Sequence, residues 1–120
     1  GPRGNVYLGV AAMLAFTVGS NSGSGQYIVH VIETERGLRM TCSCEAAIHG
    51  DLCRHRLALL SGDLSALISG AEQAADLGSL VTGSAVLAEK ERLDSLEKEA
   101  ANVKRAIAGS KRALARLMEG

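Results

Sequence analysis

The spacing of hydrophobic residues changes along the chain from a period of two, through three and four, to seven. Residues 14–18 (LAFTV) alternate between large and small side chains, which predicts a short strand. Residues 27–34 (YIVHVIET) are rich in β-branched residues and apolar on both faces, which predicts a central strand. Glu35-Arg36-Gly37 is a predicted turn, after which residues 38–42 return as a second strand. A β-hairpin is therefore expected to end at residue 42.

The pattern becomes helical after residue 53. One apolar stripe at helical spacing comprises Leu57, Leu60, Leu64, Leu67, Ile68 and Ala71. Glycines at 62 and 70 are expected to divide this stretch into shorter helices, with Ser69 and Glu72 forming a capping box. Residues 77–84 (LGSLVTGS) are a predicted hinge, because two glycines and two serines interrupt the period.

From Ala85 to the end the chain lacks proline and has a heptad pattern. Two series of positions spaced by seven contain Val86, Leu93, Ala100, Ile107 and Leu114, and Glu89, Leu96, Val103, Ser110 and Leu117. All but Glu89 and Ser110 are apolar, which favours a coiled coil that pairs with itself or with a partner over residues 86–117. An amphipathic helix packed on its own domain, or an intramolecular helical hairpin, is the alternative.

Three cysteines and one histidine have the spacing C-x-C-x8-C-x-H, at Cys42, Cys44, Cys53 and His55. Residues i and i+2, such as Cys42 and Cys44, share a face at a strand end, whereas within a helix they diverge. The second pair, Cys53 and His55, is therefore expected at a helix start. Three thiolates and one imidazole are a typical tetrahedral set for structural Zn²⁺. His49 in the intervening loop is a rival fourth ligand, and His30 is expected to be a packed residue of the long strand.

This motif, with Tyr27-Ile28-Val29 before it and an Ala/Leu-rich helix after His55, resembles the SWIM zinc finger over about residues 14–62. The resemblance implies a ββα arrangement and a role in binding DNA or proteins. The residue after the second cysteine is frequently proline in this family and is Glu45 here.

Composition sets the expected fold class. The chain has no Trp, one Phe and two Tyr, so its core is expected to need a staple such as a metal. We expect an α+β fold, a short antiparallel sheet plus helix that binds zinc, followed by helices. The expected divisions are an N-terminal segment at 1–13, the finger at 14–62, short helices and a hinge at 63–82, and the long helix at 83–120.

Two N-terminal features bear on processing. Gly1-Pro2 resembles a remnant of protease cleavage, and residues 6–18 form an apolar run that is too short to cross a membrane. Residues 19–25 (GSNSGSG) form a predicted loop. An odd number of cysteines argues against a disulfide framework, and zinc thiolates persist best in reducing compartments, so an intracellular, cytoplasmic protein is expected.

Charge and motifs narrow the expected function. The net charge is zero, and the sequence has no glycine-rich phosphate motif and no recognisable catalytic set, so an enzyme is not expected. We expect a non-catalytic interaction module of the adaptor or inhibitor type, without a membrane role. DNA or RNA binding is the alternative, with candidate contacts at Arg36, Arg39, Arg54, Arg56, Lys104, Arg105, Lys111, Arg112 and Arg116. Arginines near the finger could equally offset the negative charge of the zinc thiolates and hydrogen-bond the sulfurs.

The last helix has a charge gradient. Residues 63–97 contain seven acids and two bases, whereas residues 98–116 contain six bases and one acid. This gradient favours antiparallel pairing, with the acidic part of one helix beside the basic part of another.

Overall fold

The structure, a computed structural model, describes residues 10–20 and 25–120. Gly1-Pro2, the rest of residues 1–9 and the centre of the predicted 19–25 loop lie outside the described residues. The chain divides into two compact units, residues 1–88 and 89–120, and each is described by itself.

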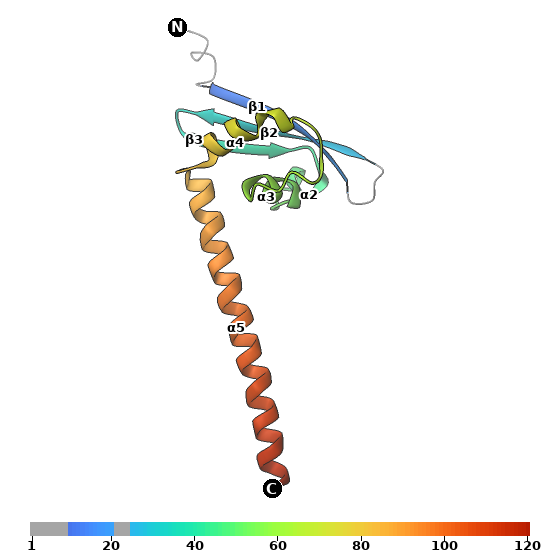
Figure 1. The fold of residues 1–120 in the computed structure, drawn as a ribbon, viewed down its shortest axis with the longest axis vertical. Coiled ribbons are helices and arrows are strands. Elements are labelled where there is room, and N and C mark those ends of the chain that lie inside the picture. The colour runs from blue at the N-terminus through green and yellow to red at the C-terminus, as the bar shows by residue number, and fades with distance from the viewer. Residues whose placement is uncertain (1–9, 21–24) are drawn as a thin grey trace. The chain divides into compact units, whose positions relative to one another are not determined.

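The first unit is built on an antiparallel sheet with the strand order β3-β2-β1-β4 (Figure 1). Its strands are β1 (Val10–Gly19), β2 (Gln26–Thr34), β3 (Gly37–Cys42) and β4 (Leu67–Ser69). Its helical segments are α2 (Glu45–Ile48), α3 (Arg54–Leu60), the 3₁₀ helix η1 (Ala71–Gln73) and α4 (Ala74–Val81), and the long helix α5 (Ala85–Glu119) follows. The predicted α+β class is confirmed, as is the hairpin that ends at residue 42.

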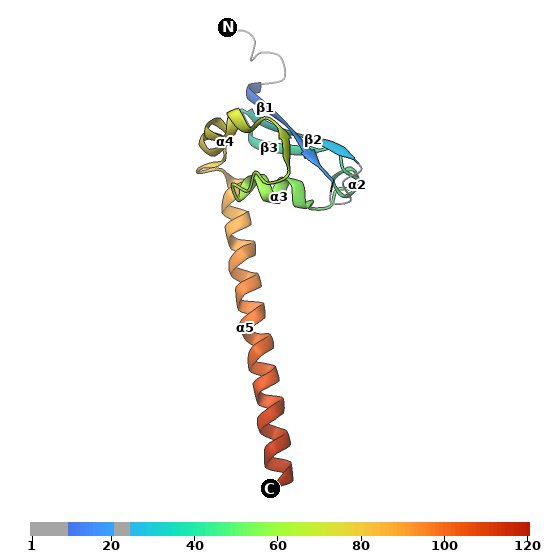
Figure 2. The ribbon, with the colours of Figure 1, turned by 45° about the vertical axis from the view of Figure 1, so that its right-hand side comes forward.

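One face of the sheet contributes most of the core. Phe16 pairs with Val29 and Leu14 with Val31, so the alternation predicted for residues 14–18 places their large side chains on one buried face. Leu59 of α3 and the α4 side chains Leu77 and Val81 belong to the same buried cluster, and Figure 2 shows both helices beside the sheet. The opposite face carries Met13 of β1, which is exposed.

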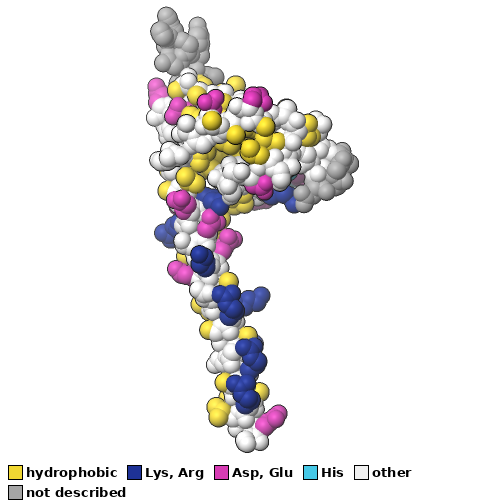
Figure 3. Space-filling view, viewed as in Figure 1, with side chains coloured by type: hydrophobic (Ala, Val, Ile, Leu, Met, Phe, Trp, Pro, Cys, Tyr) yellow, Lys and Arg dark blue, Asp and Glu magenta, His cyan; other side chains and the backbone are white. Residues whose placement is uncertain are grey.

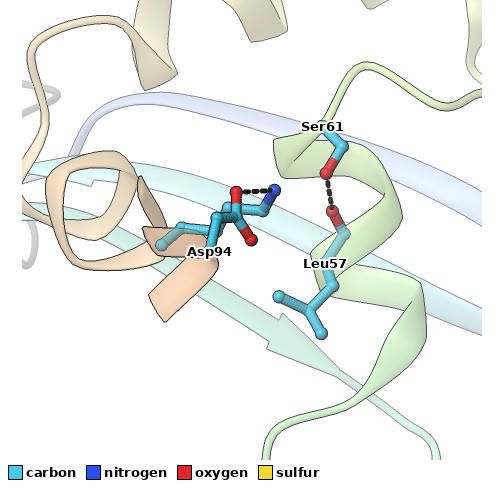
Figure 4. Close-up of polar contacts among 4 residues, drawn as sticks. Leu57, Ser61 and Asp94 are labelled. Atoms are coloured by element: carbon cyan, nitrogen blue, oxygen red, sulfur yellow. Dashed lines mark hydrogen bonds and ion pairs between the residues drawn. The ribbon is translucent and has the colours of Figure 1, made fainter. Parts of the chain in front are cut away.

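Helix α3 ends at Leu60 and Gly62 breaks the helical stretch as predicted, but the short helix expected between Gly62 and Gly70 does not form. The Ser61 hydroxyl donates to the Leu57 carbonyl at 3.0 Å (Figure 4), and Gly62 then adopts a positive φ of 76°. Leu67–Ser69 forms β4 instead, which pairs with Thr17 and Val18 of β1. The apolar side chains of this segment suit either structure, and pairing with a distant strand decides the outcome.

The predicted capping box at Ser69 and Glu72 does not form. Gly70, with φ of 107°, precedes η1, and no side chain caps that turn. The predicted hinge is also shorter than expected, because Leu77–Val81 belongs to α4 and both of these residues are buried. The break is confined to residues 82–84, where the Ser84 hydroxyl accepts the Leu87 N–H and begins α5.

Helix α5 is a single continuous helix of 35 residues, as its proline-free sequence predicts. It does not fold back into a hairpin, and none of its residues is buried. Only its first turn belongs to the first unit, where Leu87 packs against the core cluster. Lys90 and Asp94 form an i,i+4 ion pair of 2.7 Å on its surface (Figure 4).

Gly70 provides a test of this packing. A Cβ at this position would lie 2.8 Å from Phe16 Cδ1 and 3.1 Å from the Ala15 carbonyl oxygen. We expect Gly70→Ala to lower the free energy of unfolding by about 2–4 kcal/mol, through overpacking and a strained φ. Gly83→Ala is the control, since its φ is also positive but no atom lies within 4 Å of the added Cβ. Denaturation followed by tyrosine fluorescence measures the first unit alone, because both tyrosines precede residue 28. Equal losses in the two variants would contradict the packing argument.

Candidate metal centre

The four predicted ligands converge where β3 ends and α3 begins. Cys42 is the last residue of β3, Cys44 directly precedes α2, Cys53 is the N-cap of α3, and His55 is the second residue of that helix. One ligand atom from each residue lies within 4.8 Å of the others. The cysteines are 3–9% exposed and His55 is 9% exposed, so the cluster is closed to bulk water.

Backbone pairing at the end of the hairpin places the first two sulfurs on one side. Ser43 continues the pairing with β2, because its N–H donates to the Ile28 carbonyl and its hydroxyl accepts the Ile28 N–H. Ser43 is exposed, whereas Cys42 and Cys44 on either side of it are buried. The expectation that Cys42 and Cys44 share a face at the strand end is therefore confirmed.

The loop between the two ligand pairs contains the short helix α2, which the sequence analysis missed. It spans four residues, and Ala46 and Ala47 pack against the core cluster. The consecutive alanines were the available signal, since alanine has the highest helix propensity, but a single turn is too short to show a period. Gly50, with φ of 84°, follows α2, and the Asp51 N–H then donates to the Ala46 carbonyl.

The rival histidines lie outside the cluster. His49 is exposed immediately after α2, and His30 is half-buried in the sheet opposite Ala15 and Thr41. The ring of His55, by contrast, lies 5.0 Å from the ring of Tyr27, which holds it beside the sheet. The ligand set is therefore Cys42, Cys44, Cys53 and His55.

The cluster has dimensions that suit Zn²⁺. Tetrahedral coordination, with zinc–sulfur bonds near 2.3 Å and zinc–nitrogen bonds near 2.0 Å, places a sulfur and a nitrogen about 3.6 Å apart. The distance from Cys42 Sγ to His55 Nδ1 is 3.7 Å. The Cys₃His donor set and the enclosed site are those of a structural zinc centre, so Zn²⁺ is the cofactor that these residues fit.

The electrostatics of the cluster differ between its members. Burial raises the pKa of the Cys42 thiol to about 12, and the neighbouring cysteines add to this rise. Burial acts in the same direction on Cys53, but hydrogen bonds from Arg56 outweigh it and lower the pKa of this thiol. Burial, followed by the charge of Arg54, lowers the pKa of His55 and favours the neutral imidazole that binds metals. These shifts favour the metal-binding forms of Cys53 and His55, and oppose ionisation of the Cys42 thiol.

Arg56 is the residue that supports the cluster from outside. Its Nε donates to Cys53 Sγ at 3.2 Å, and its backbone N–H faces the same sulfur at 3.5 Å. Its other guanidinium nitrogens donate to the Met40 carbonyl at 3.3 Å and to the Asp51 carbonyl at 2.7 Å. One side chain thus links a ligand sulfur, strand β3 and the loop, which confirms for Arg56 the expected hydrogen bonding of the sulfur.

The other candidate basic contacts are divided between the two units. Arg36, Arg39 and Arg54 are exposed. Arg39 pairs with Ile32 in the sheet and alternates with the buried-face residues, whereas Arg54 begins α3, which packs on that buried face. The remaining five candidates are exposed on the second unit: Lys104, Arg105, Lys111, Arg112 and Arg116.

A Cys₃His cluster held between a hairpin end and a helix start defines the first unit as a zinc-finger domain. Residues 27–61 match the family model of the SWIM zinc finger, which confirms the resemblance for this part of the chain. Comparison with curated proteins and with solved structures gave no match. Among the helices that the structure describes, none combines the length and apolar character needed to cross a membrane.

His55 and His49 form a matched pair for testing the ligand set. We expect His55→Ala to lose bound zinc and to unfold the first unit, because structural zinc contributes on the order of 10 kcal/mol to the folding of such sites. His49→Ala should keep both the metal and the fold, since His49 is exposed outside the cluster. Elemental analysis measures the zinc, and amide hydrogen exchange measures the protection of β1–β3. Zinc retained by His55→Ala and lost by His49→Ala would reverse the assignment.

Arg56 can be tested against Arg54. Arg56→Gln removes the Nε bond to the Cys53 sulfur, and we expect zinc affinity to fall about 10- to 100-fold, as it does when outer partners of a metal ligand are lost. Arg54→Gln removes the same charge from an exposed position and should change affinity little near pH 8, where His55 is neutral. Competition with a chromogenic chelator measures both constants, and similar losses would show that charge alone matters.

Proposed function

We propose that this chain is a non-catalytic interaction module, in which a zinc-stabilised finger supports a long helix that binds a partner protein. The observation that carries this proposal is the exposure of the apolar residues of α5. Its exposed large apolar side chains are 46–79% accessible and comprise Leu96, Val103, Ile107, Leu114, Leu117 and Met118. All except Met118 occupy the heptad positions predicted from the sequence.

An exposed stripe of this kind favours a partner. Helices in proteins are stabilised mainly by burying an apolar face, and contiguous exposed apolar surface commonly marks an interaction site. We define the α5 seam as Leu93, Leu96, Ala100, Val103, Ile107, Ser110, Leu114 and Leu117. A second helix laid along the seam would bury these residues in knobs-into-holes packing.

The zinc cluster supports a structural role rather than catalysis. Four protein ligands fill a tetrahedral site and leave no position for a water nucleophile or a substrate. All three thiols of the chain are ligands, so none is left as a nucleophile. The site would therefore act on function only by keeping the first unit folded.

Nucleic-acid binding is the second candidate, and one observation favours it. Residues 100–118 contain five bases and no acid, and Figure 3 shows Lys and Arg side chains along this part of the helix. The finger itself argues against it. Residues 26–63 contain four bases and five acids, and Arg56 is held at the zinc cluster. Arg39 and Arg54 also belong to opposite sides of the sheet. Protein binding is therefore the better supported proposal, because it explains the exposed apolar residues of α5 and does not require a basic surface on the finger.

Site-specific photocrosslinking tests this proposal. Benzoylphenylalanine at Ala106, which flanks the seam, should give protein adducts in cells that make this protein, because a partner helix would cover this position. The same group at Arg112, on the outer side of the helix, is the control and should give few. Adducts destroyed by nuclease, together with duplex binding that weakens steeply as salt rises, would establish the nucleic-acid alternative instead.

A further inference from the structure

We infer that the partner of α5 is a second copy of this chain, paired antiparallel so that Val103 of one copy faces Ile107 of the other. This inference rests on the proposed function, because it names the partner for the α5 seam. Three features of the helix carry it: the fit of the seam residues, the distribution of charge, and the side chains that flank the seam.

The seam is complementary to itself in this register. In an antiparallel pair, each layer joins residues from the two different heptad series. Placing Val103 opposite Ile107 fixes every other layer, as Leu93 with Leu117, Leu96 with Leu114, and Ala100 with Ser110. The two small residues therefore face each other, and large residues face large ones. Glu89, the charged exception in the heptads, lies outside these four layers.

Within the part of the chain that the structure describes, the bases in the second half of α5 form no ion pair with an acid of the same helix. Its recorded ion pairs are Lys90 with Asp94, at 2.7 Å, and Arg92 with Glu89, at 3.8 Å. Both lie in the first part of the helix. Among the described residues, no ion pair involves the five bases between 104 and 116. These bases are the ones that need a partner to supply acids.

An antiparallel copy supplies those acids. Residues 89–99 contain five acids and three bases, whereas residues 100–118 contain five bases and no acid. A parallel copy would align the basic segments with each other over their whole length, within the Debye length of about 8 Å at physiological salt. It would also place Glu89 opposite Glu89 in the seam. In the antiparallel register, residues 111–118, which contain three bases and no acid, lie beside residues 92–99 of the second copy, which contain three acids and two bases, whereas residues 100–110 lie beside each other.

The side chains beside the seam agree with this register. On one side, Glu97 faces Lys111 of the second copy, and on the other, Ala106 faces Ala106 of the second copy and permits a close approach. One unfavourable contact remains, because the two Lys104 side chains meet near the centre. In a parallel pair Lys104 would instead face Glu99 of the second copy. The effect of removing the Lys104 charge therefore has opposite signs in the two orientations.

The decisive experiment is sedimentation equilibrium of the zinc-loaded full chain over a wide range of concentration. We expect a monomer–dimer equilibrium. Lys104→Gln should tighten the dimer roughly two- to fivefold, as expected for relief of one exposed like-charged contact. Arg105→Gln is the control, because it removes the same charge from the outer face of the helix. Weaker association of Lys104→Gln would establish a parallel pair, and a monomer at every concentration would overturn self-pairing.

A charge exchange tests the register independently. Glu97→Lys and Lys111→Glu should each weaken the dimer, because each places like charges opposite one another, and the double variant should restore it. The matched control is Glu91→Lys with Arg112→Glu, on the outer face, which should leave association unchanged. Failure of the double variant to restore pairing would overturn the register.

A monomeric chain that still forms protein adducts from Ala106 in cells would overturn self-pairing and leave the proposed function standing, whereas a monomer without adducts would overturn both.

Discussion

The rest of the first unit depends on one constraint, the joining of a strand end to a helix start by four metal ligands. The largest fully buried side chains of the described residues are one phenylalanine and two valines, Phe16, Val29 and Val31. Burial of each such side chain contributes about 1.5–3 kcal/mol. Structural zinc contributes on the order of 10 kcal/mol in small domains, so the cluster is worth several core residues and joins the start of α3 to the end of β3. Burial of this arrangement has a cost, since it raises the pKa of the Cys42 thiol to about 12 and so opposes formation of the metal-binding thiolate.

Arg56 extends that constraint beyond the ligands. Three thiolates around Zn²⁺ carry one net negative charge, and the guanidinium at 3.2 Å from Cys53 Sγ offsets it locally. Because the same group donates to carbonyls of Met40 and Asp51, the charge that stabilises the sulfur also fixes the strand and the loop. A lysine could place a charge here, but it lacks the planar set of donors that reaches three acceptors at once.

The parts of this structure that the sequence predicts are those set by local chemistry. Cys42 and Cys44 at a strand end, and Cys53 and His55 at a helix start, follow from how strands and helices orient neighbouring residues. Helix α5 follows from a long proline-free heptad pattern.

The missed elements depend on distant contacts or are too short for a period. Leu67–Ser69 becomes a strand only because β1 is present to pair with it, and α2 is a single turn. In α4, the spacing of Leu77 and Val81 was a helix signal that the glycine and serine between them obscured. The metal ligands were predictable because residue type and spacing determine coordination. The edge strand β4 was not, because its pairing depends on the whole fold.

The two units use their apolar residues in opposite ways, and this separates their roles. In the first unit the alternating large residues of β1 and β2 are buried, and metal binding would add the stability that this small core lacks. In the second unit the apolar residues remain on the surface, on a helix rich in strong helix formers such as Ala, Glu, Lys, Arg and Leu. Loss of zinc would therefore unfold the first unit, whereas the helix that carries the α5 seam depends on its own sequence and should stay folded. Conversely, the seam supplies no metal ligand, because the four ligands belong to the first unit and the seam to the second. Metal binding is thus a property of the first unit, whereas the proposed pairing is a property of the second.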